Sequence, residues 1–535
     1  PNTSTASRGD GFDIRERSTL ASGVERYSGS LFGHFEIADH VKLVGQFLYS
    51  KQIGNDPFGT QSILRSNTGF TANGGGTVTF NRNNPFLTQS AIDTLTALKP
   101  SFGTGSSLYL SRFFDILPSR NRGSERETWR ALVGLEGDFN AGDRAFYWSV
   151  TASRGQTQGY SEVYAPYANH LNNALSAVRL PSGQIVCAIN GDAITTNDDP
   201  ACVPINPFGN SRPSPEAVAY STVLTGNSFK NIQDDYLATL GGDVVRLPGG
   251  TAKFSLAYEH RREFAEFNPY EADRQGIAFN SEPSLPVAAE YNTDELSGEL
   301  FIPLVGGDFT LPLVKALEIN GSYRYVDNSI AGKESVWGAG VRWDTGYGVT
   351  FRGSRSRNFR APSLTQIFSP VRTSTAPIGI DPCDADRLNQ GVPSVRLANC
   401  TALFAANPGY GPLASFQDPA ENNSFALVAS GGNLNLNNEV SNTLTYGILV
   451  QPAFIPGLSF NADRIEVDLH NGLIAFSPAS FLAQCYDSTE YPNAACDTFT
   501  RNAQGFVVSG TSTTFKAAVD KYSGEIYNLS YNLPL

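Results

Sequence analysis

The stretch YSGSLFGHFEIADHVKLVGQFLYS, residues 27–50, decides the fold. Apolar or small residues alternate with polar ones along 27–37, and the alternation resumes along 41–49 after a short turn at 38–40. Because successive side chains of a β-strand point to opposite faces, each half has one apolar face and one polar face. The stretch therefore predicts an antiparallel β-hairpin.

The same alternation recurs in further paired runs that are separated by short turns. The strands predicted on this basis are 129–139 with 146–152, 235–246 with 251–263, 294–303 with 315–327, 334–344 with 347–357, 441–451 with 457–469, and 524–533. Within the run 457–469 the apolar face changes near Asp463 and Arg464, which predicts a β-bulge at that point. Together with the first hairpin, the chain is predicted to carry about thirteen strands.

Long polar connections separate these hairpins. They span 52–126, 157–233, 264–293, 358–440 and 470–513. Short turns at one end and long loops at the other are typical of transmembrane β-barrels, whose turns are periplasmic and whose loops are extracellular. Aromatic residues near strand ends would form the interfacial girdles of such a barrel: Tyr49, Trp129, Phe139, Trp148 and Trp343. The sequence thus predicts an all-β protein, an antiparallel transmembrane β-barrel, in preference to a soluble repeat protein such as a propeller.

The composition fits a β-barrel wall better than a helical membrane protein or a large soluble core. Hydrophobic residues make up 40 % of the 535 residues, yet Phe (34) and Tyr (22) are abundant. No stretch approaches the roughly 18 consecutive apolar residues of a transmembrane helix. The formal net charge of -12 argues against nucleic acid as a partner, because nucleic-acid-binding surfaces are basic.

The six cysteines form three close pairs in the sequence, each within a long loop: Cys187 with Cys202, Cys383 with Cys400, and Cys485 with Cys496. An even number with local pairing favours three loop disulfides and an oxidising compartment. Each disulfide would stabilise its loop by roughly 3 kcal/mol in the chain-entropy model. A metal site is the alternative, but the sequence has no CxxC motif or Cys/His cluster, and we expect neither a metal nor a cofactor.

Signatures of enzymes are absent from the sequence. It has no GxSxG elbow, P-loop, HExxH motif or dinucleotide fingerprint, so we predict no catalytic residue and no enzymatic activity. Ligand sites of such a barrel are expected in the long loops, where aromatic side chains with polar neighbours suit sugars and chelates alike. The candidate ligand-binding residues, for each of which packing within the loop is the alternative, are Tyr160, Tyr164, Tyr167, His170, Arg372, Tyr410, Phe416 and Tyr486.

Two stretches resemble motifs of a known family. Residues 357–368, RNFRAPSLTQIF, resemble the FRAPSLxELF stretch of TonB-dependent outer-membrane receptors, and residues 432–441, GNLNLNNEVS, resemble their NPNLxPExS strand start without its two prolines. Residues 202–209, CVPINPFG, are similar to a loop of the large receptors of this family. By this resemblance, the motif residues expected to face the lumen of the barrel are Arg357, Asn358, Phe359, Arg360 and Pro362.

The resemblance implies a barrel of 22 strands with a plug domain inside it, and import energised by the inner-membrane TonB complex. This chain shows neither a plug nor a TonB box, and it has fewer strands. We therefore expect residues 1–535 to be a partial barrel domain, with the plug N-terminal to residue 1 and further strands after residue 535. The expected location is the bacterial outer membrane, in contact with its lipid.

The function implied is TonB-energised uptake of a scarce large solute: a ferric siderophore, cobalamin or an oligosaccharide. A passive porin-like or structural surface barrel is the alternative, and a secreted β-rich glycan-processing enzyme is a weaker one. The expected partners are membrane lipid, the TonB complex through the plug, and the small-molecule, chelate or glycan solute. A surface lipoprotein is a further candidate partner.

Overall fold

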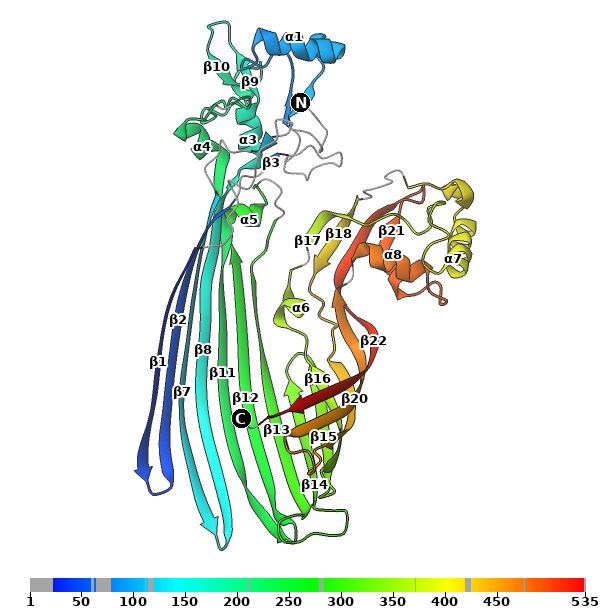
Figure 1. The fold of residues 1–535 in the computed structure, drawn as a ribbon. Coiled ribbons are helices and arrows are strands. Elements are labelled where there is room, and N and C mark those ends of the chain that lie inside the picture. The colour runs from blue at the N-terminus through cyan, green and yellow to red at the C-terminus, as the bar shows by residue number, and fades with distance from the viewer. Residues whose placement is uncertain are drawn as a thin grey trace.

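In a computed structural model, the chain is dominated by one large antiparallel sheet that curves like part of a barrel wall (Figure 1). The structure describes residues 23–58, 62–63, 78–110, 112–113, 120–209, 211–278, 283–370, 372–418, 425–475 and 477–533. Within these residues, thirteen long strands follow one another across the sheet in chain order. The all-β antiparallel fold predicted from the sequence is confirmed, and so is the number of strands in the wall.

The strands of the wall are β1 (Gly23–Ala38), β2 (Val41–Phe58), β7 (Arg120–Ala141), β8 (Arg144–Pro166), β11 (Thr222–Leu247), β12 (Gly250–Pro269), β13 (Val287–Val305), β14 (Ala316–Asn328), β15 (Gly332–Asp344), β16 (Val349–Arg360), β19 (Glu439–Val450), β20 (Leu458–Ala475) and β22 (Val507–Tyr531). Beyond the wall, β22 also pairs with β18 (Phe425–Gly431) and β21 (Phe499–Arg501), and β18 pairs with β17 (Arg372–Pro377). Among the described residues, no ladder joins β1 to β22, so the sheet has two edges there.

Short turns join the strands at the lower end of Figure 1, and long loops join them at the upper end. Only Gly142 and Asp143 separate β7 from β8, and Gly142 adopts the positive φ of 69° that such a tight turn requires. The loops carry helices α1 (Gln89–Leu98), α2 (Pro100–Gly103), α3 (Ala168–Leu175), α4 (Pro215–Ser221), α5 (Glu271–Gln275), α6 (Leu364–Phe368), α7 (Pro393–Ala406) and α8 (Pro478–Tyr486). No helix in the described part of the chain has the length and apolar character needed to cross a membrane.

Several strands extend further toward the loops than predicted. β8 continues to Pro166, so Tyr160 and Tyr164 lie in this strand and not in a loop. β11 already begins at Thr222, which shortens the predicted loop 157–233 from its other end. The apolar alternation stops before the strands do, because the upper parts of the strands carry polar side chains on both faces while the backbone pairing continues.

Alternation gives the wall two different faces. The outward face carries large apolar side chains that are exposed, such as Leu31 and Leu296, with 69 % and 59 % of their surface accessible. The inward face, on which α6 lies, carries many Ser, Thr and Gly residues and ion pairs such as Arg261 with Glu295. The buried hydrophobic clusters lie instead in the loops. A soluble protein rarely exposes so large an apolar surface, so the outward face requires an apolar environment.

The apolar band on the outward face runs obliquely to the strand register. On β2 it spans Val41–Tyr49 and centres on Gly45, and on β15 it spans Trp337–Trp343 and centres on Gly340. Seven strand-to-strand steps separate β2 from β15. If the pairing is followed across these steps, Gly45 is in register with Lys333 of β15. The centre of the band on β15, Gly340, is therefore displaced by seven residues along the strand. One residue per step, with a rise of about 3.4 Å and a strand spacing of about 4.8 Å, corresponds to a tilt of about 35°. Closed β-barrels have strand tilts in this range.

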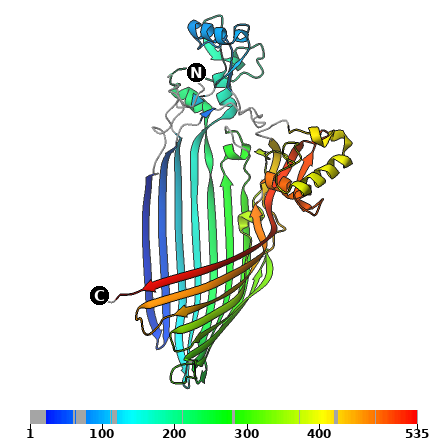
Figure 2. The same ribbon diagram turned by 45° about the vertical axis from the view of Figure 1, so that its right-hand side comes forward.

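The predicted β-bulge near Asp463 and Arg464 is wrong. The pairing of β20 with β19 runs through both residues without a shift, and its pairing with β22 first shifts beyond Leu469. The outward face of β20 nevertheless changes from apolar at Ala462 to charged at Arg464, which forms an ion pair with Glu525 of β22. β20 and β22 slant strongly relative to β1–β12 (Figure 2), so the change of face marks the point at which β20 leaves the apolar band.

Candidate functional site

A cavity of about 740 Å³ lies on the inward face beside the loop ends of β11, β12 and β13. One wall consists of these strands. The other consists of α6 with the residues that follow it, and of the facing parts of β18 and β22. A concave site of this size with apolar walls and a few polar groups is the form that small-molecule sites take, so we regard it as the candidate functional site.

Two rows of side chains in register form the strand wall. The rows are Phe229–Phe267–Val287 and Asn231–Ala265–Ala289. Glu266 also borders the cavity, but alternation directs its side chain to the opposite face, where the carboxylate accepts a hydrogen bond from Asn268 Nδ2 at 2.7 Å. The strand wall is therefore apolar apart from the amide of Asn231.

The opposite wall begins with α6, which lies inside the first family-like motif, residues 357–368. The Ser363 hydroxyl accepts a hydrogen bond from Gln366 N at 3.2 Å, and Gln366 Oε1 accepts one from Ser363 N at 2.9 Å. This reciprocal capping box fixes the start of the helix. A helix of five residues is too short to be stable alone, so capping and tertiary contacts must hold it in place.

The second family-like motif docks on the first. Gly432 N donates to Ser369 O at 2.7 Å, and Asn433 N donates to Gln366 O at 2.9 Å. The side-chain amide of Asn433 also donates to Thr514 O of β22 at 3.0 Å. These bonds bring three segments that are distant in sequence together as one wall of the cavity.

An ion pair anchors both motifs to the sheet. Arg360, at the end of β16, bonds the carboxylate of Glu439, at the start of β19. The same carboxylate accepts a hydrogen bond from Leu473 N of β20 at 2.6 Å. The two strands from which the motif segments leave are thus tied together at their loop ends.

The five motif residues do not share one face of the sheet. By register, Asn358 and Arg360 lie on the inward face and Phe359 lies on the outward face, whereas Arg357, at the last position paired with β15, reaches a carboxylate of the inward row Glu295–Val326–Glu334. The Arg357 guanidinium donates to Glu334 of β15 at 2.7 Å. Pro362 is buried just beyond the end of β16. Consecutive residues of a strand cannot all face the lumen, because their side chains alternate between the two faces of the sheet.

The six cysteines pair in the structure as their spacing predicts, with disulfides Cys187–Cys202, Cys383–Cys400 and Cys485–Cys496. They define two compact loop units: the first disulfide unit, residues 167–221, and the second disulfide unit, which combines residues 378–418, 425–428 and 478–507. In the described part of the chain, no group of three or more His, Cys, Asp or Glu side chains is placed to hold a metal ion.

Tyr167 and His170 pack inside the first disulfide unit. The His170 ring stacks between Tyr167 and Tyr220, with ring centroids 3.8 Å and 4.3 Å away. The Tyr220 hydroxyl donates to Asp199 at 2.6 Å. Burial, together with this hydrogen bond, raises the pKa of Tyr220 to about 12. These aromatic side chains hold the loop together and do not reach the cavity.

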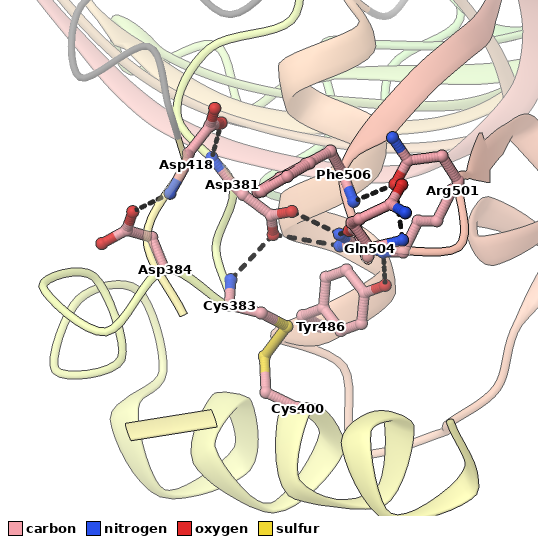
Figure 3. A network of polar contacts seen from close by, with 11 residues as sticks. Asp381, Cys383, Asp384, Cys400, Asp418, Tyr486, Arg501, Gln504 and Phe506 are labelled. Atoms are coloured by element: carbon pink, nitrogen blue, oxygen red, sulfur yellow. Dashed lines mark hydrogen bonds and ion pairs between the residues drawn. A yellow bond between two sulfur atoms is a disulfide. The ribbon is translucent and has the colours of Figure 1, made fainter. Parts of the chain in front are cut away.

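A buried ion pair lies at the centre of the second disulfide unit and joins segments 120 residues apart (Figure 3). Arg501 and Asp381 form a bidentate pair, with 5 % and 3 % of their side chains exposed. Burial disfavours the charge of Arg501, but the Asp381 carboxylate outweighs it and raises the pKa of the guanidinium above its usual value. Arg501 Nε also donates to the Tyr486 hydroxyl at 3.2 Å, and burial raises the pKa of Tyr486 to about 12.

The candidate ligand residues predicted from the sequence do not come together. Tyr160 and Tyr164 lie in β8, whereas Tyr410, Phe416 and Tyr486 pack within the second disulfide unit. The side chain of Arg372 lies outside the described residues. None of the other seven candidate residues lines the cavity.

The aromatic residues of the cavity wall were not found by sequence reasoning. Phe229 and Phe267 lie in the upper parts of β11 and β12, within the predicted loops 157–233 and 264–293. Phe229 has Asn227 and Asn231 at period two, and Phe267 has only Ala265 and Pro269, so neither lies in a run of alternating large apolar residues, the pattern that predicts a strand. Only the pairing of the two strands shows that both rings lie on the inward face.

No protein-family model and no curated protein matches the chain. Among solved structures, it is similar to the RagAB peptide importer in its closed-closed state, with 11 % identity and a TM-score of 0.45 over 96 % of this chain and 45 % of that chain. The siderophore receptor PirA from Acinetobacter baumannii is 9 % identical, with a TM-score of 0.35 over 96 % and 61 %. The ferric enterobactin receptor PfeA from Pseudomonas aeruginosa is 11 % identical, with a TM-score of 0.36 over 97 % and 61 %. This chain therefore spans about half to three fifths of the length of these structures.

The buried ion pair gives a first prediction. Asp381→Asn leaves the Arg501 guanidinium buried without a counter-charge, so we expect it to destabilise the second disulfide unit by about 3–5 kcal/mol. The measurement is the rate of limited proteolysis within residues 378–418 and 478–507 of the native protein. Glu490→Gln, an exposed carboxylate of the same unit, is the matched control and should leave the rate unchanged. Equal rates for both variants would contradict a stabilising role for the pair.

A second prediction concerns alkaline pH. The folded unit holds the pKa of Tyr486 near 12, above the ordinary value of about 10, so folding favours the neutral phenol. The resulting stability is complete below pH 10 and is lost as the pH rises toward 12, by an amount on the order of 2–3 kcal/mol. Urea unfolding followed by near-UV circular dichroism should show this loss in the wild type. The loss of stability should be smaller in Tyr486→Phe than in the wild type. In Tyr347→Phe, which changes an exposed tyrosine of a turn, the loss should equal that of the wild type.

Proposed function

We propose that this chain forms the wall of a receptor in the bacterial outer membrane and takes part in TonB-energised uptake of a scarce large solute. The solute classes considered are ferric siderophores, cobalamin and oligosaccharides. The sheet would cross the membrane as part of a β-barrel, with the turns in the periplasm and the two disulfide units outside the cell.

The observation that carries this proposal is the outward face. Its apolar band continues from strand to strand with a displacement of one residue per step, which is the slope that tilted strands need to keep one level band in a bilayer. Tyr49 and Trp129 pair at the upper border of the band, and Phe139 and Phe146 pair at its lower border. Aromatic residues at both borders fit the two interfaces of a membrane.

The inward side supports transport rather than a purely structural role. It carries polar side chains and ion pairs suited to a water-filled lumen, and it holds the cavity at its loop end, where a solute from outside would arrive. The first segment that resembles a receptor motif, residues 357–368, contributes α6 to the opposite wall of that cavity, and the second, residues 432–441, is hydrogen-bonded to it. The disulfides fit an oxidising location outside the cytoplasm.

The two unpaired edges of the sheet support a longer barrel. An open edge in hydrocarbon leaves backbone N–H and C=O groups without partners, at several kcal/mol for each group, so β1 and β22 need neighbouring strands. We propose that further strands of the same polypeptide close the barrel and that a plug domain, preceding this chain, fills it and contacts the TonB complex. A passive porin-like or structural barrel remains the second candidate.

Uptake by living cells distinguishes these functions. Cells that produce the native protein should accumulate its solute, and a protonophore that collapses the inner-membrane proton gradient should abolish the accumulation. Accumulation that survives the protonophore would establish a passive barrel instead. A protein recovered without detergent, with no heat-dependent gel mobility, would exclude the membrane barrel and favour a secreted protein.

A substitution on the apolar band tests the membrane face directly. Leu256→Arg places a charge near the middle of the band on β12, and we expect it to reduce the stability of the protein in lipid vesicles by about 2–4 kcal/mol. Ala257→Arg, the next residue on the same strand, faces inward and is the matched control, with an expected change below about 1 kcal/mol. Folding into vesicles at graded urea concentrations measures both. A larger loss for Ala257→Arg would reverse our assignment of the two faces.

A further inference from the structure

We propose that the cavity between β11–β13 and α6 binds an uncharged, hydroxyl-rich oligosaccharide. This inference rests on the proposed uptake function and selects one of its solute classes. Two features of the described lining carry it: its side chains that face the cavity are uncharged, and the wall combines aromatic rings with hydroxyl and amide groups.

Among the described residues, the cavity lining offers no counter-charge to a charged solute. Glu266 is the one ionisable residue among the described lining residues, and its carboxylate is engaged by Asn268 on the opposite face. The Arg126 guanidinium lies over the Phe229 ring, with Cζ 5.6 Å from the ring centroid, and is not part of the lining. Moving an anion from water into such a site is costly, because no counter-charge in the described lining offsets the loss of its hydration.

The uncharged groups of the lining match the two kinds of surface that a sugar ring presents. Phe229 and Phe267 supply aromatic surface for the C–H face of a sugar. Hydroxyl and amide side chains, which can each donate and accept hydrogen bonds, line the remaining surface: Asn231, Thr365, Gln366, Ser369, Ser430 and Thr514. The volume of about 740 Å³ is large enough for several sugar rings.

The other solute classes fit this lining less well. An anionic ferric chelate would need basic side chains, and none of the described lining residues carries one. Cobalamin carries a phosphodiester, and a free peptide carries two charged termini, so each would leave at least one charge without a partner. An uncharged oligosaccharide leaves no charge unpaired.

The test is direct binding by the native protein, purified in detergent and titrated calorimetrically. The probes are a panel of neutral tetrasaccharides that includes maltotetraose and cellotetraose, the anionic tetragalacturonate, and a ferric tris-catecholate. We expect binding of at least one neutral tetrasaccharide and of neither anion. Phe267→Ala should weaken that binding by roughly tenfold or more, because it removes an aromatic surface. Phe264→Ala, on the same strand but facing outward, should leave it unchanged.

A substitution that introduces a positive charge tests whether the cavity prefers a neutral or an anionic solute. Ala265→Lys places a cation in the strand wall, so it should weaken binding of the neutral tetrasaccharide. Selective binding of either anion by the wild type, strengthened by Ala265→Lys, would overturn the inference, as would binding of no neutral member of the panel. Either of these binding results would overturn the oligosaccharide inference without contradicting the uptake proposal. The uptake proposal would be contradicted by other results: accumulation that resists the protonophore, or a protein recovered without detergent.

Discussion

Backbone hydrogen bonding between neighbouring strands is the interaction on which the rest of the structure depends. From β2 to β15 the shifts in register lie near the turns, at Asp243/Val245 and Pro303/Val305, so above them every alternate side chain falls on the same face and a band of apolar residues on one strand is continued on the next. The displacement of one residue per step then fixes the tilt of the strands. The same ladders continue above the band, where side chains no longer separate into apolar and polar faces, and there they carry the cavity wall.

How far the sequence predicts this structure depends on where apolar alternation is present. The hairpin of β1 and β2 and the lower half of β7 and β8 are found from sequence because one face is apolar at every second residue. The upper half of β8, with Tyr160 and Tyr164, was interpreted as loop because both faces are polar there, although the backbone stays paired. The face change at Asp463 was read as a bulge because a single sequence carries no information on how steeply a strand crosses the apolar band.

The loop units show a different limit of sequence reasoning. Cysteine spacing predicts their disulfides, since each pair is separated by fewer than twenty residues. The ion pair of Arg501 with Asp381 joins residues 120 positions apart, and no local pattern reveals it. Tyr410, Phe416 and Tyr486 were interpreted as ligand residues because they are aromatic and lie in a loop. A loop long enough to fold needs a core of its own to offset its conformational entropy, and these side chains provide one.

The two family-like motifs acquire a physical meaning from their contact with each other. The first motif contains the end of β16, at Arg360, and the second contains the start of β19, at Glu439, and the ion pair between these residues holds the two strand ends together. From there the chain forms α6 on one side and the segment of Gly432 and Asn433 on the other, and the hydrogen bonds between them close one wall of the cavity. The opposite wall belongs to β11, β12 and β13, which precede both motifs in the sequence. The ion pair and the hydrogen bonds between the motifs therefore hold one wall of the cavity against strands from an earlier part of the sheet.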